Sequence, residues 1–321
     1  MSPLRRFIGL LLSALPLLTV LPLLAAEDGK LTVTWLEMPV HGLAAVVETP
    51  SHKVFLVDTG GVKTGPNENY NAGRDTVTPF LRQRGYSEIT GILISHPHGD
   101  HYGGLEWLLQ NWTVKEMVDQ GYEGRAQTLA YKRLRDLAMQ RGGKYRAIVS
   151  GDHLDWDPQL SLEILSPPAT FISADSDPKK VSDHGLLNSN SLLLRMQHGK
   201  IVFLFPGDAY GGAFESFLKE NVPMEKLRTT VLTAPHHGFN PGYDFPKMLM
   251  PQYVVTSCLA DYAGNAGTPN PRSPGDRAME VYGKLGAEVF VTAFHGQVQA
   301  VSDGQKVTLT KTRERQPKTA P

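Results

Sequence analysis

A run of three histidines and one aspartate within six positions constrains this chain more than any other feature of its sequence. The run, Ser95-His96-Pro97-His98-Gly99-Asp100-His101, follows the apolar stretch Ile92-Leu93-Ile94, which is typical of a buried strand. Imidazole and carboxylate groups are the usual protein ligands of zinc and related divalent ions. We therefore predict a metal site on the loop after this strand, with a histidine-rich surface turn that binds nothing as the alternative.

The spacing of the ligands within this loop predicts two ions. His96 and His98 are two positions apart, so a tight loop can turn both side chains toward one point. Asp100 and His101 can turn toward a second point a short distance away. Gly99 allows the backbone to turn sharply because it has no Cβ.

Three more residues of the same chemical types follow apolar stretches elsewhere in the chain. Asp208 follows the stretch at 201–204, and His236 follows the stretch at 230–233. Asp58 directly follows another apolar stretch and precedes Thr59 and two glycines. An aspartate at a strand end can bridge two ions, and a histidine at a neighbouring strand end can complete the second ion. For Asp58 we expect a hydrogen-bonding role that orients the histidine loop.

Short apolar runs bounded by Gly, Pro, Asn and Asp recur along the chain and predict strands, with a few helices between them. This pattern predicts an α/β (α+β) domain over residues 27–310, followed by a polar C-terminal tail over residues 311–321. The predicted helices span residues 127–140 and 214–220, and a third begins after Ser273. The predicted strands span residues 31–38, 43–48, 54–57, 92–94, 162–165, 192–196, 201–205, 230–233, 253–256, 289–291 and 298–301.

The N-terminal segment has the pattern of a secretory signal. Arg5 and Arg6 precede an apolar run over residues 7–24, which ends in small residues. We expect residues 1–26 to be a signal peptide, which implies a secreted or periplasmic protein with no stable membrane association after cleavage. An uncleaved membrane anchor is the alternative because the run is long, although Pro16 and Pro22 interrupt it.

The charge totals give no sign of a strongly basic, nucleic-acid-binding chain, and the cysteine count excludes a chain stabilised by internal disulfides. The chain has 32 basic and 32 acidic residues, so its net charge does not attract it strongly to nucleic acids or anionic membranes, although a local basic patch is compatible with these totals. Its single cysteine, Cys258, excludes a disulfide within the chain.

In their order along the chain, these motifs resemble the metallo-β-lactamase superfamily, and within it the hydrolase domain of ComEC-type competence proteins. The resemblance also includes the stretch 42–50, the stretch 188–195 and Pro235-His236-His237-Gly238. It implies a four-layer αββα sandwich with a metal site at one edge, where strand ends meet. It further implies a metal-dependent hydrolase.

The resemblance also implies a ligand set. One ion would take His96 and His98, the other would take Asp100, His101 and His236, and Asp208 would bridge them. The further candidates, which contact either these ligands or the substrate, are Asp58, Asn188 and His237.

Some positions depart from the superfamily pattern. Many members supply a third histidine to the first ion, whereas this chain has Asn188 there, as competence-type members do. His184 is a nearby alternative ligand, and His237 is an alternative to His236. His41 stands where competence-type members usually have glutamine, and a contact between His41 and the substrate is one of its open roles.

The implied chemistry is hydrolysis by a water that two divalent ions activate, with Asp100 and Asp208 holding the resulting hydroxide. Zinc suits the histidines, and manganese is the alternative. We expect a phosphodiester, nucleic-acid-like substrate. The alternatives are a small-molecule substrate of a lactonase or β-lactamase type, and a metal-binding protein with little turnover. The loops at 64–74 and 262–272 are candidates for substrate contact, and no protein partner can be read from the sequence.

Overall fold

The computed structural model describes residues 29–65, 68–123, 129–172, 183–240, 242, 244–259 and 273–315. The predicted signal peptide and the predicted substrate loop at 262–272 lie outside the described residues, as does the side chain of His184. Within the described part of the chain, no helix has both the length and the apolar character needed to cross a bilayer.

Two sheets form the centre of the molecule. The larger sheet has eight strands, in the order β10 (Lys144–Ala147), β9 (Glu116–Asp119), β7 (Gly91–Leu93), β3 (Val54–Val57), β2 (Ala45–Glu48), β1 (Leu31–Trp35), β17 (Val298–Ser302) and β18 (Val307–Lys311). The smaller sheet has six, in the order β11 (Ser161–Ser166), β12 (Leu193–His198), β13 (Ile201–Phe205), β14 (Val231–Thr233), β15 (Tyr253–Thr256) and β16 (Glu288–Val291). The two-stranded pairs are β4 (Val62–Gly65) with β5 (Glu68–Asn71), and β6 (Glu88–Ile89) with β8 (Thr113–Val114).

The two sheets pack face to face, and each also has apolar residues on its outer face. In β3, Phe55 and Val57 belong to a core cluster that also contains Phe203 and Val255 of the smaller sheet. Leu56, between them, belongs instead to a cluster on the outer face of the larger sheet. Successive side chains of a strand point to opposite faces, so a fully apolar strand can be buried on both.

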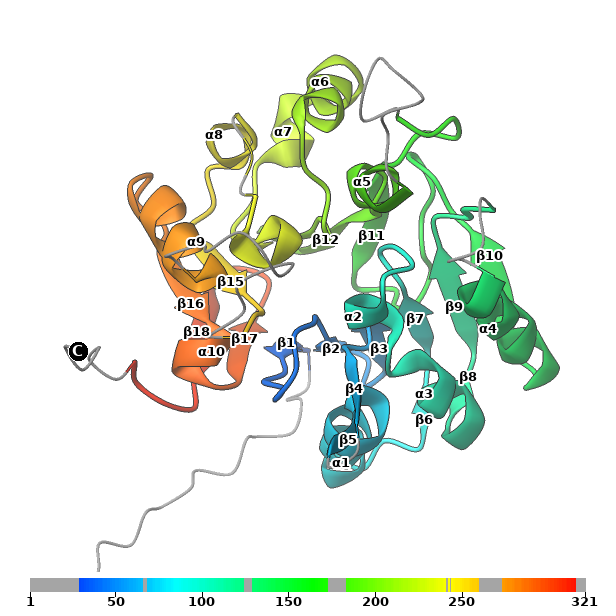
Figure 1. Cartoon of the computed structure of the whole chain (residues 1–321). Helices are drawn as coiled ribbons and strands as arrows, with labels where there is room; N and C mark the ends of the chain where they lie inside the picture. Colours follow the sequence, from blue (N-terminus) through cyan, green and yellow to red (C-terminus); the bar gives the residue numbers. More distant parts are fainter. Residues whose placement is uncertain are drawn as a thin grey trace, which may run out of the picture.

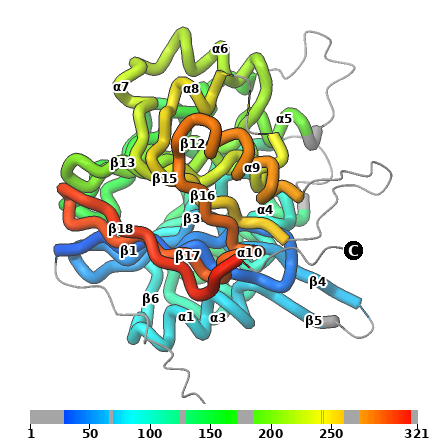
Figure 2. Tube along the Cα trace, turned by 90° about the vertical axis from the view of Figure 1, so that its left-hand side faces the viewer, coloured from blue at the N-terminus to red at the C-terminus, as the bar shows by residue number. Residues whose placement is uncertain are grey.

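Helices cover both outer faces (Figures 1 and 2). The outer face of the larger sheet packs against α1 (Thr78–Gln83), α3 (Leu105–Asn111) and α4 (Leu129–Gln140). The outer face of the smaller sheet packs against α6 (Gly212–Asn221), α8 (Phe245–Leu249) and α9 (Pro274–Gly283). This arrangement confirms the predicted four-layer αββα sandwich. The other helical segments are η1 (Gly73–Val77), α2 (Gly99–Tyr102), α5 (Asp183–Ser189), α7 (Met224–Leu227), η3 (Pro235–Gly238) and α10 (Thr292–His295).

Parallel strands in both sheets position the site. β3 runs parallel to β7 in the larger sheet, and β13 runs parallel to β14 in the smaller one. Parallel neighbours have their carboxyl ends at the same edge, so the loops that follow them lie close together. These loops carry Asp58, the histidine run, Asp208 and the two histidines of η3.

The C-terminal segment is held in place beyond the point at which we predicted a tail. Lys311 is the last residue of β18 and pairs with Val298. The backbone N–H of Arg313 donates to the carbonyl oxygen of His295 at 3.0 Å, and the Arg315 guanidinium contacts Asp276 at 2.6 Å. The ordered fold therefore includes residues 311–315.

Candidate metal centre

Asp58 orients the histidine loop through contacts with Ser95 and His101. Its carboxylate accepts the backbone N–H of Ser95 at 2.7 Å and the Ser95 hydroxyl at 2.9 Å, and it lies 2.8 Å from Nδ1 of His101. Because a carboxylate only accepts hydrogen bonds, the Nδ1 atom of His101 carries the proton and its Nε2 atom presents a lone pair to the centre. These are the contacts expected of a residue that orients the loop.

A group of four side chains forms the first candidate ion site: Asp100, His101, Asp208 and His237. Nε2 of His101 lies 3.1 Å from Asp208 Oδ1, and Nε2 of His237 lies 3.2 Å from Asp100 Oδ2. Ligands about 2.0–2.1 Å from a tetrahedral zinc ion are about 3.3 Å from one another. The spacing in this group therefore fits a tetrahedral ion.

A second group shares Asp208 with the first. It consists of His96, His98 and Asp208, whose ligand atoms lie within 4.8 Å of one another. Nε2 of His96 is 2.8 Å from Nδ1 of His98 and 3.6 Å from Asp208 Oδ2. Since the two oxygens of Asp208 face different groups, the carboxylate can bridge two ions, as the superfamily resemblance implied.

The proton positions in the four-residue group call for a cation. Nδ1 of His237 lies 2.8 Å from the backbone oxygen of Ser257, and a carbonyl oxygen can only accept. The proton of His237 is therefore on Nδ1, as it is in His101. The two Nε2 atoms face each other at 3.1 Å with a lone pair each, which is favourable only if a metal ion or a proton lies between them.

Charge within the centre shifts several pKa values. Burial opposes ionisation of Asp208, but the surrounding histidines prevail and lower its pKa well below its usual value. Burial likewise lowers the pKa of His101, but Asp208, Asp58 and Asp100 outweigh it and raise that pKa well above 6.5. The pKa of His237 is raised too, since Asp208 and Asp100 outweigh its burial.

These shifts predict that metal binding releases protons. The raised pKa values of His101 and His237 favour their protonated forms in the metal-free protein, and an ion that binds their Nε2 atoms displaces the protons there. We expect the metal affinity to fall as the pH decreases from 8 to 6. Titration calorimetry in buffers with different ionisation enthalpies measures the number released. A binding enthalpy that is the same in all buffers would contradict this assignment.

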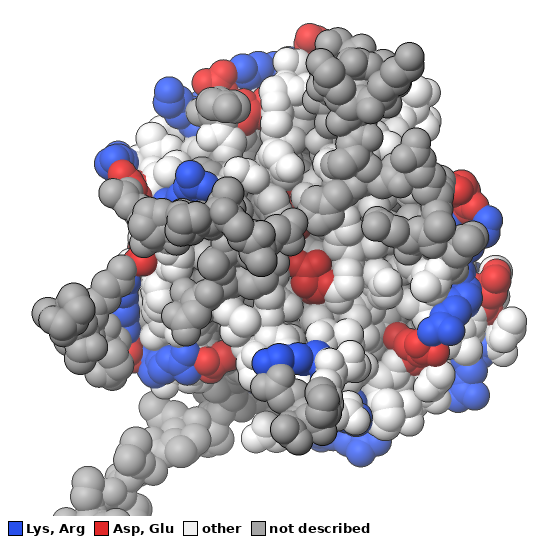
Figure 3. Space-filling model, in the orientation of Figure 1, with Lys and Arg blue, Asp and Glu red and all other residues white. Residues whose placement is uncertain are grey.

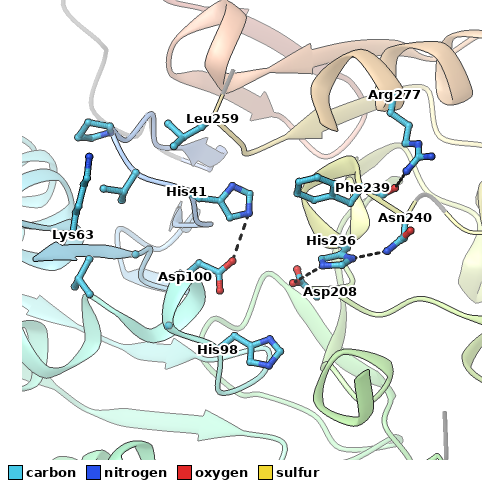
Figure 4. A pocket seen from close by; sticks show the side chains of 15 residues that line it. His41, Lys63, His98, Asp100, Asp208, His236, Phe239, Asn240, Leu259 and Arg277 are labelled. Atoms are coloured by element: carbon cyan, nitrogen blue, oxygen red, sulfur yellow. Dashed lines mark hydrogen bonds and ion pairs between the residues drawn. The ribbon is translucent and has the colours of Figure 1, made fainter. Parts of the chain in front are cut away.

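Neither group includes His236, which differs from the implied ligand set. Its Nε2 atom is 3.8 Å from Asp208 Oδ2, and its Nδ1 atom is 2.9 Å from Nδ2 of Asn240 (Figure 4). His237, the alternative at the sequence level, occupies the place that the resemblance gave to His236. Two adjacent histidines cannot be told apart by spacing.

Asn188, which stands where many members have a histidine, is fully buried. Neither atom of its side-chain amide has a hydrogen-bond partner among the described residues. Its backbone oxygen accepts the N–H of Ser191, whose hydroxyl in turn accepts the N–H of Asp208. Asn188 is thus connected through Ser191 to the backbone of Asp208.

His41 is part of the centre, although the sequence left its role open. Its Nε2 atom lies 3.6 Å from Asp100 Oδ2, and its ring lies 4.1 Å from the ring of His237. Gly42 brings this segment close to the metal loop, since a Cβ there would collide with the carbonyl oxygen of Asp100. Burial and the neighbouring His237 lower the pKa of His41 to about 2, so its ring is neutral at physiological pH.

The centre opens into a pocket of about 710 Å³. In Figure 3 acidic side chains lie in the middle of a largely uncharged area, and basic side chains lie below them. Figure 4 shows Lys63 and Arg277 on different sides of the pocket. Phe239 and Leu259 supply apolar walls.

The segment just before the predicted substrate loop at 64–74 forms one rim of this pocket, whereas no described residue of 64–74 itself lines it. Val62 and Lys63 belong to β4, which pairs with β5 in a hairpin that projects from the body of the molecule (Figure 2). The segment is therefore a hairpin rather than an irregular loop. Lys63, Asn240 and Arg277 were not predicted, because single polar residues far from the motif give no signal of their own in the sequence.

Substituting Asp58 tests its orienting role. We expect Asp58→Asn to weaken metal binding by about 10–100-fold, because the amide can place a donor against Nδ1 of His101. Competition with a chromophoric chelator measures the affinity. Asp136→Asn, a change at an exposed carboxylate on α4 away from the site, is the control. An unchanged affinity in Asp58→Asn would contradict the role.

Comparisons with known proteins agree with this geometry. A sequence profile described as the metallo-beta-lactamase superfamily matches residues 38–207. ComE operon protein 3 of Bacillus subtilis (strain 168) is 25% identical over 212 residues, which are 63% of this chain and 25% of that protein. Uncharacterized protein YcaI of Escherichia coli (strain K12) is 24% identical over 206 residues, or 64% of this chain and 22% of that protein. The chain thus spans about a quarter of the length of these relatives.

A solved structure shares the fold. CmlA, a diiron beta-hydroxylase from Streptomyces venezuelae, superimposes with a TM-score of 0.50 and 12% sequence identity. The superposition covers 83% of this chain and 53% of CmlA. At this identity the likeness concerns the fold alone.

Proposed function

The chain belongs to the metallo-beta-lactamase superfamily, and on this premise we propose that it is a secreted hydrolase of phosphodiester bonds in nucleic-acid-like substrates. That it is a metal-dependent hydrolase follows from the family and from the two candidate ion sites. One observation carries the substrate proposal. Two groups of ligands share the carboxylate of Asp208, and paired ions that stabilise both the attacking and the leaving oxygen are typical of phosphatases and nucleases.

When bound at these two groups, divalent ions would lower the pKa of a water toward ~7 and neutralise charge on a phosphoryl oxygen. The chain's own residues prepare the site for this chemistry. Asp58 and the Ser257 carbonyl fix the rings of His101 and His237, so these ligands need no rearrangement. Asp100 is partly exposed to the pocket and can accept a hydrogen bond from the attacking water.

The charges around the pocket support an anionic substrate. Two basic side chains, Lys63 and Arg277, line it. The Arg277 guanidinium donates to the backbone oxygen of Phe239 at 2.6 Å, which holds it at the rim. Its remaining donors can contact a phosphate group.

We propose zinc as the metal, since histidines supply two ligands in each group. Manganese is the alternative, because the shared and partly exposed carboxylates also suit a harder ion. For the location, we propose export, on the N-terminal pattern of two arginines, an apolar run and small residues. The presence of a single cysteine is compatible with an oxidising compartment.

An activity screen tests the proposed function. The metal-loaded protein is incubated with bis(p-nitrophenyl) phosphate, single- and double-stranded DNA, nitrocefin and a panel of lactones, and its metal content is measured by mass spectrometry. We expect turnover of the phosphodiesters. If only nitrocefin or lactones were turned over, the substrate would be a small molecule and not a phosphodiester. If metal were bound but no compound were turned over, the chain would be a metal-binding protein and not a hydrolase of these substrates.

Asp100→Ala is the matched variant for this screen. Asp100 belongs to only one of the two ligand groups, so we expect the other ion to remain. Loss of one ligand and of the acceptor for the attacking water should lower kcat/KM by about 10²-fold, or ~2.7 kcal/mol. If the phosphodiesterase activity persisted in Asp100→Ala, it would come from a contaminant or from another site.

A further inference from the structure

The two histidines of η3 have an unusual backbone. His236 and His237 both have positive φ angles, 49° and 55°, in consecutive residues. This left-handed conformation costs a non-glycine residue on the order of 1–3 kcal/mol and persists where the surrounding structure imposes it, often at functional sites. Here it directs two adjacent rings to different environments. His237 joins the four-residue ion group, whereas His236 lines the open pocket.

The partners of the two rings assign different tautomers to them. Nδ1 of His237 faces a carbonyl oxygen and therefore carries the proton, which leaves Nε2 as a metal ligand. Nδ1 of His236 faces Nδ2 of Asn240 at 2.9 Å. A side-chain amide nitrogen only donates, so Nδ1 of His236 accepts and its proton is on Nε2. A neutral ring with its proton on Nε2 has no lone pair there for a metal.

The ring of His236 is also fixed in its plane. Tyr210 stacks on it with ring centres 4.9 Å apart and an angle of 2° between the rings. The Nε2 atom of His236 is 3.8 Å from Asp208 Oδ2, which is longer than a hydrogen bond. The donor is thus directed at the edge of the metal centre without being taken up by the bridging carboxylate (Figure 4).

From this geometry we propose that His236 is a hydrogen-bond donor to a substrate oxygen rather than a metal ligand. The inference rests on the proposed phosphodiester hydrolysis and adds a catalytic residue to it. The Nε2–H group donates to an oxygen of the phosphoryl group as negative charge grows on it, and the ring keeps its proton. Tyr210 and Asn240 are positioning residues that hold the ring and its tautomer.

A pair of adjacent substitutions tests the assignment. We expect His236→Ala to retain both ions and to lose about 10²–10³-fold in kcat on bis(p-nitrophenyl) phosphate, with little change in KM. His237→Ala, its matched control, should lose an ion. His236→Gln should recover part of kcat, since its amide can donate from a similar position. Loss of an ion in His236→Ala, or kcat values in that variant equal to those of the parent, would overturn the proposal.

Nitrogen NMR of the zinc-loaded protein tests the tautomers without any activity measurement. In a sample labelled with ¹⁵N in its histidines, we expect the His236 proton on Nε2 and the His237 proton on Nδ1. The His236→Ala spectrum assigns the signals. A His236 proton on Nδ1 would overturn the proposal. A third outcome separates the two proposals: His236 has its proton on Nε2 and both ions are bound, but no phosphodiester is hydrolysed. This outcome would contradict the proposed function and the contact of His236 with substrate. The conclusion that His236 is not a metal ligand would still hold.

Discussion

Asp208→Ala is expected to remove the ion held by His96 and His98, to weaken binding of the other ion, and to lower kcat/KM by more than about 10³-fold, or ~4 kcal/mol. The reason is that the two oxygens of Asp208 face different groups of ligands. Oδ1 faces His101 at 3.1 Å and His237 at 3.5 Å, while Oδ2 faces His96 at 3.6 Å. Without this carboxylate, one group keeps three ligands and the other keeps only two, and the positive charge of two nearby ions is less compensated.

Metal content after dialysis and the rate on bis(p-nitrophenyl) phosphate measure this effect. Asp208→Asn is a second variant, which preserves the shape of the side chain and reports on charge alone. Asp136→Ala is the control, because Asp136 is exposed on α4. Far-UV circular dichroism shows whether each variant is folded. Two ions per chain in a folded Asp208→Ala variant would mean that Asp208 does not bridge the groups.

Trp35→Ala is expected to lower the free energy of unfolding by about 3–5 kcal/mol. Trp35 is fully buried between the two sheets, and its ring lies 6.1 Å from that of Phe205 in the smaller sheet. Its indole N–H donates to the Thr233 hydroxyl at 2.9 Å. The substitution leaves a cavity and removes a contact between the sheets. Thr233 is the last residue of β14, directly before the segment of η3, so the variant should also weaken metal binding.

Urea unfolding of the metal-free protein measures the stability of this variant. Trp35→Phe separates the two contributions, since it keeps most of the apolar volume but loses the donor. We expect it to cost about 1 kcal/mol for the hydrogen bond in addition to a smaller cavity. If Trp35→Ala unfolded at the same urea concentration as the parent, Trp35 would not contribute to the packing of the sheets.

The sequence predicts most of the buried strands, although it misses β9, and it predicts the exposed ones poorly. The bounds of β3 and β15 are those expected, because both are β-branched and apolar runs that end at turn residues. β10 and β18 were missed, since their residues are largely exposed and their sequences, Lys-Tyr-Arg-Ala and Val-Thr-Leu-Thr-Lys, lack an apolar run. Both strands lie at edges of the larger sheet, where pairing on one side suffices and polar residues are tolerated.

In the candidate site, too, some residues could be predicted from the sequence and others could not. The histidine run could be identified because its ligands are adjacent in sequence and follow a buried strand. The choice between His236 and His237 could not be made, because it depends on two left-handed residues and on the carbonyl group of Ser257, twenty positions away. The pocket lining depends on a hairpin and on α9, whose proximity to the metal loop is a tertiary effect.

The pairing of β1 with β17 has a consequence for biosynthesis. Trp35 lies opposite Val298, so β1 stays at an open sheet edge until the segment that forms β17 has been synthesised. Such non-local pairing makes folding slow.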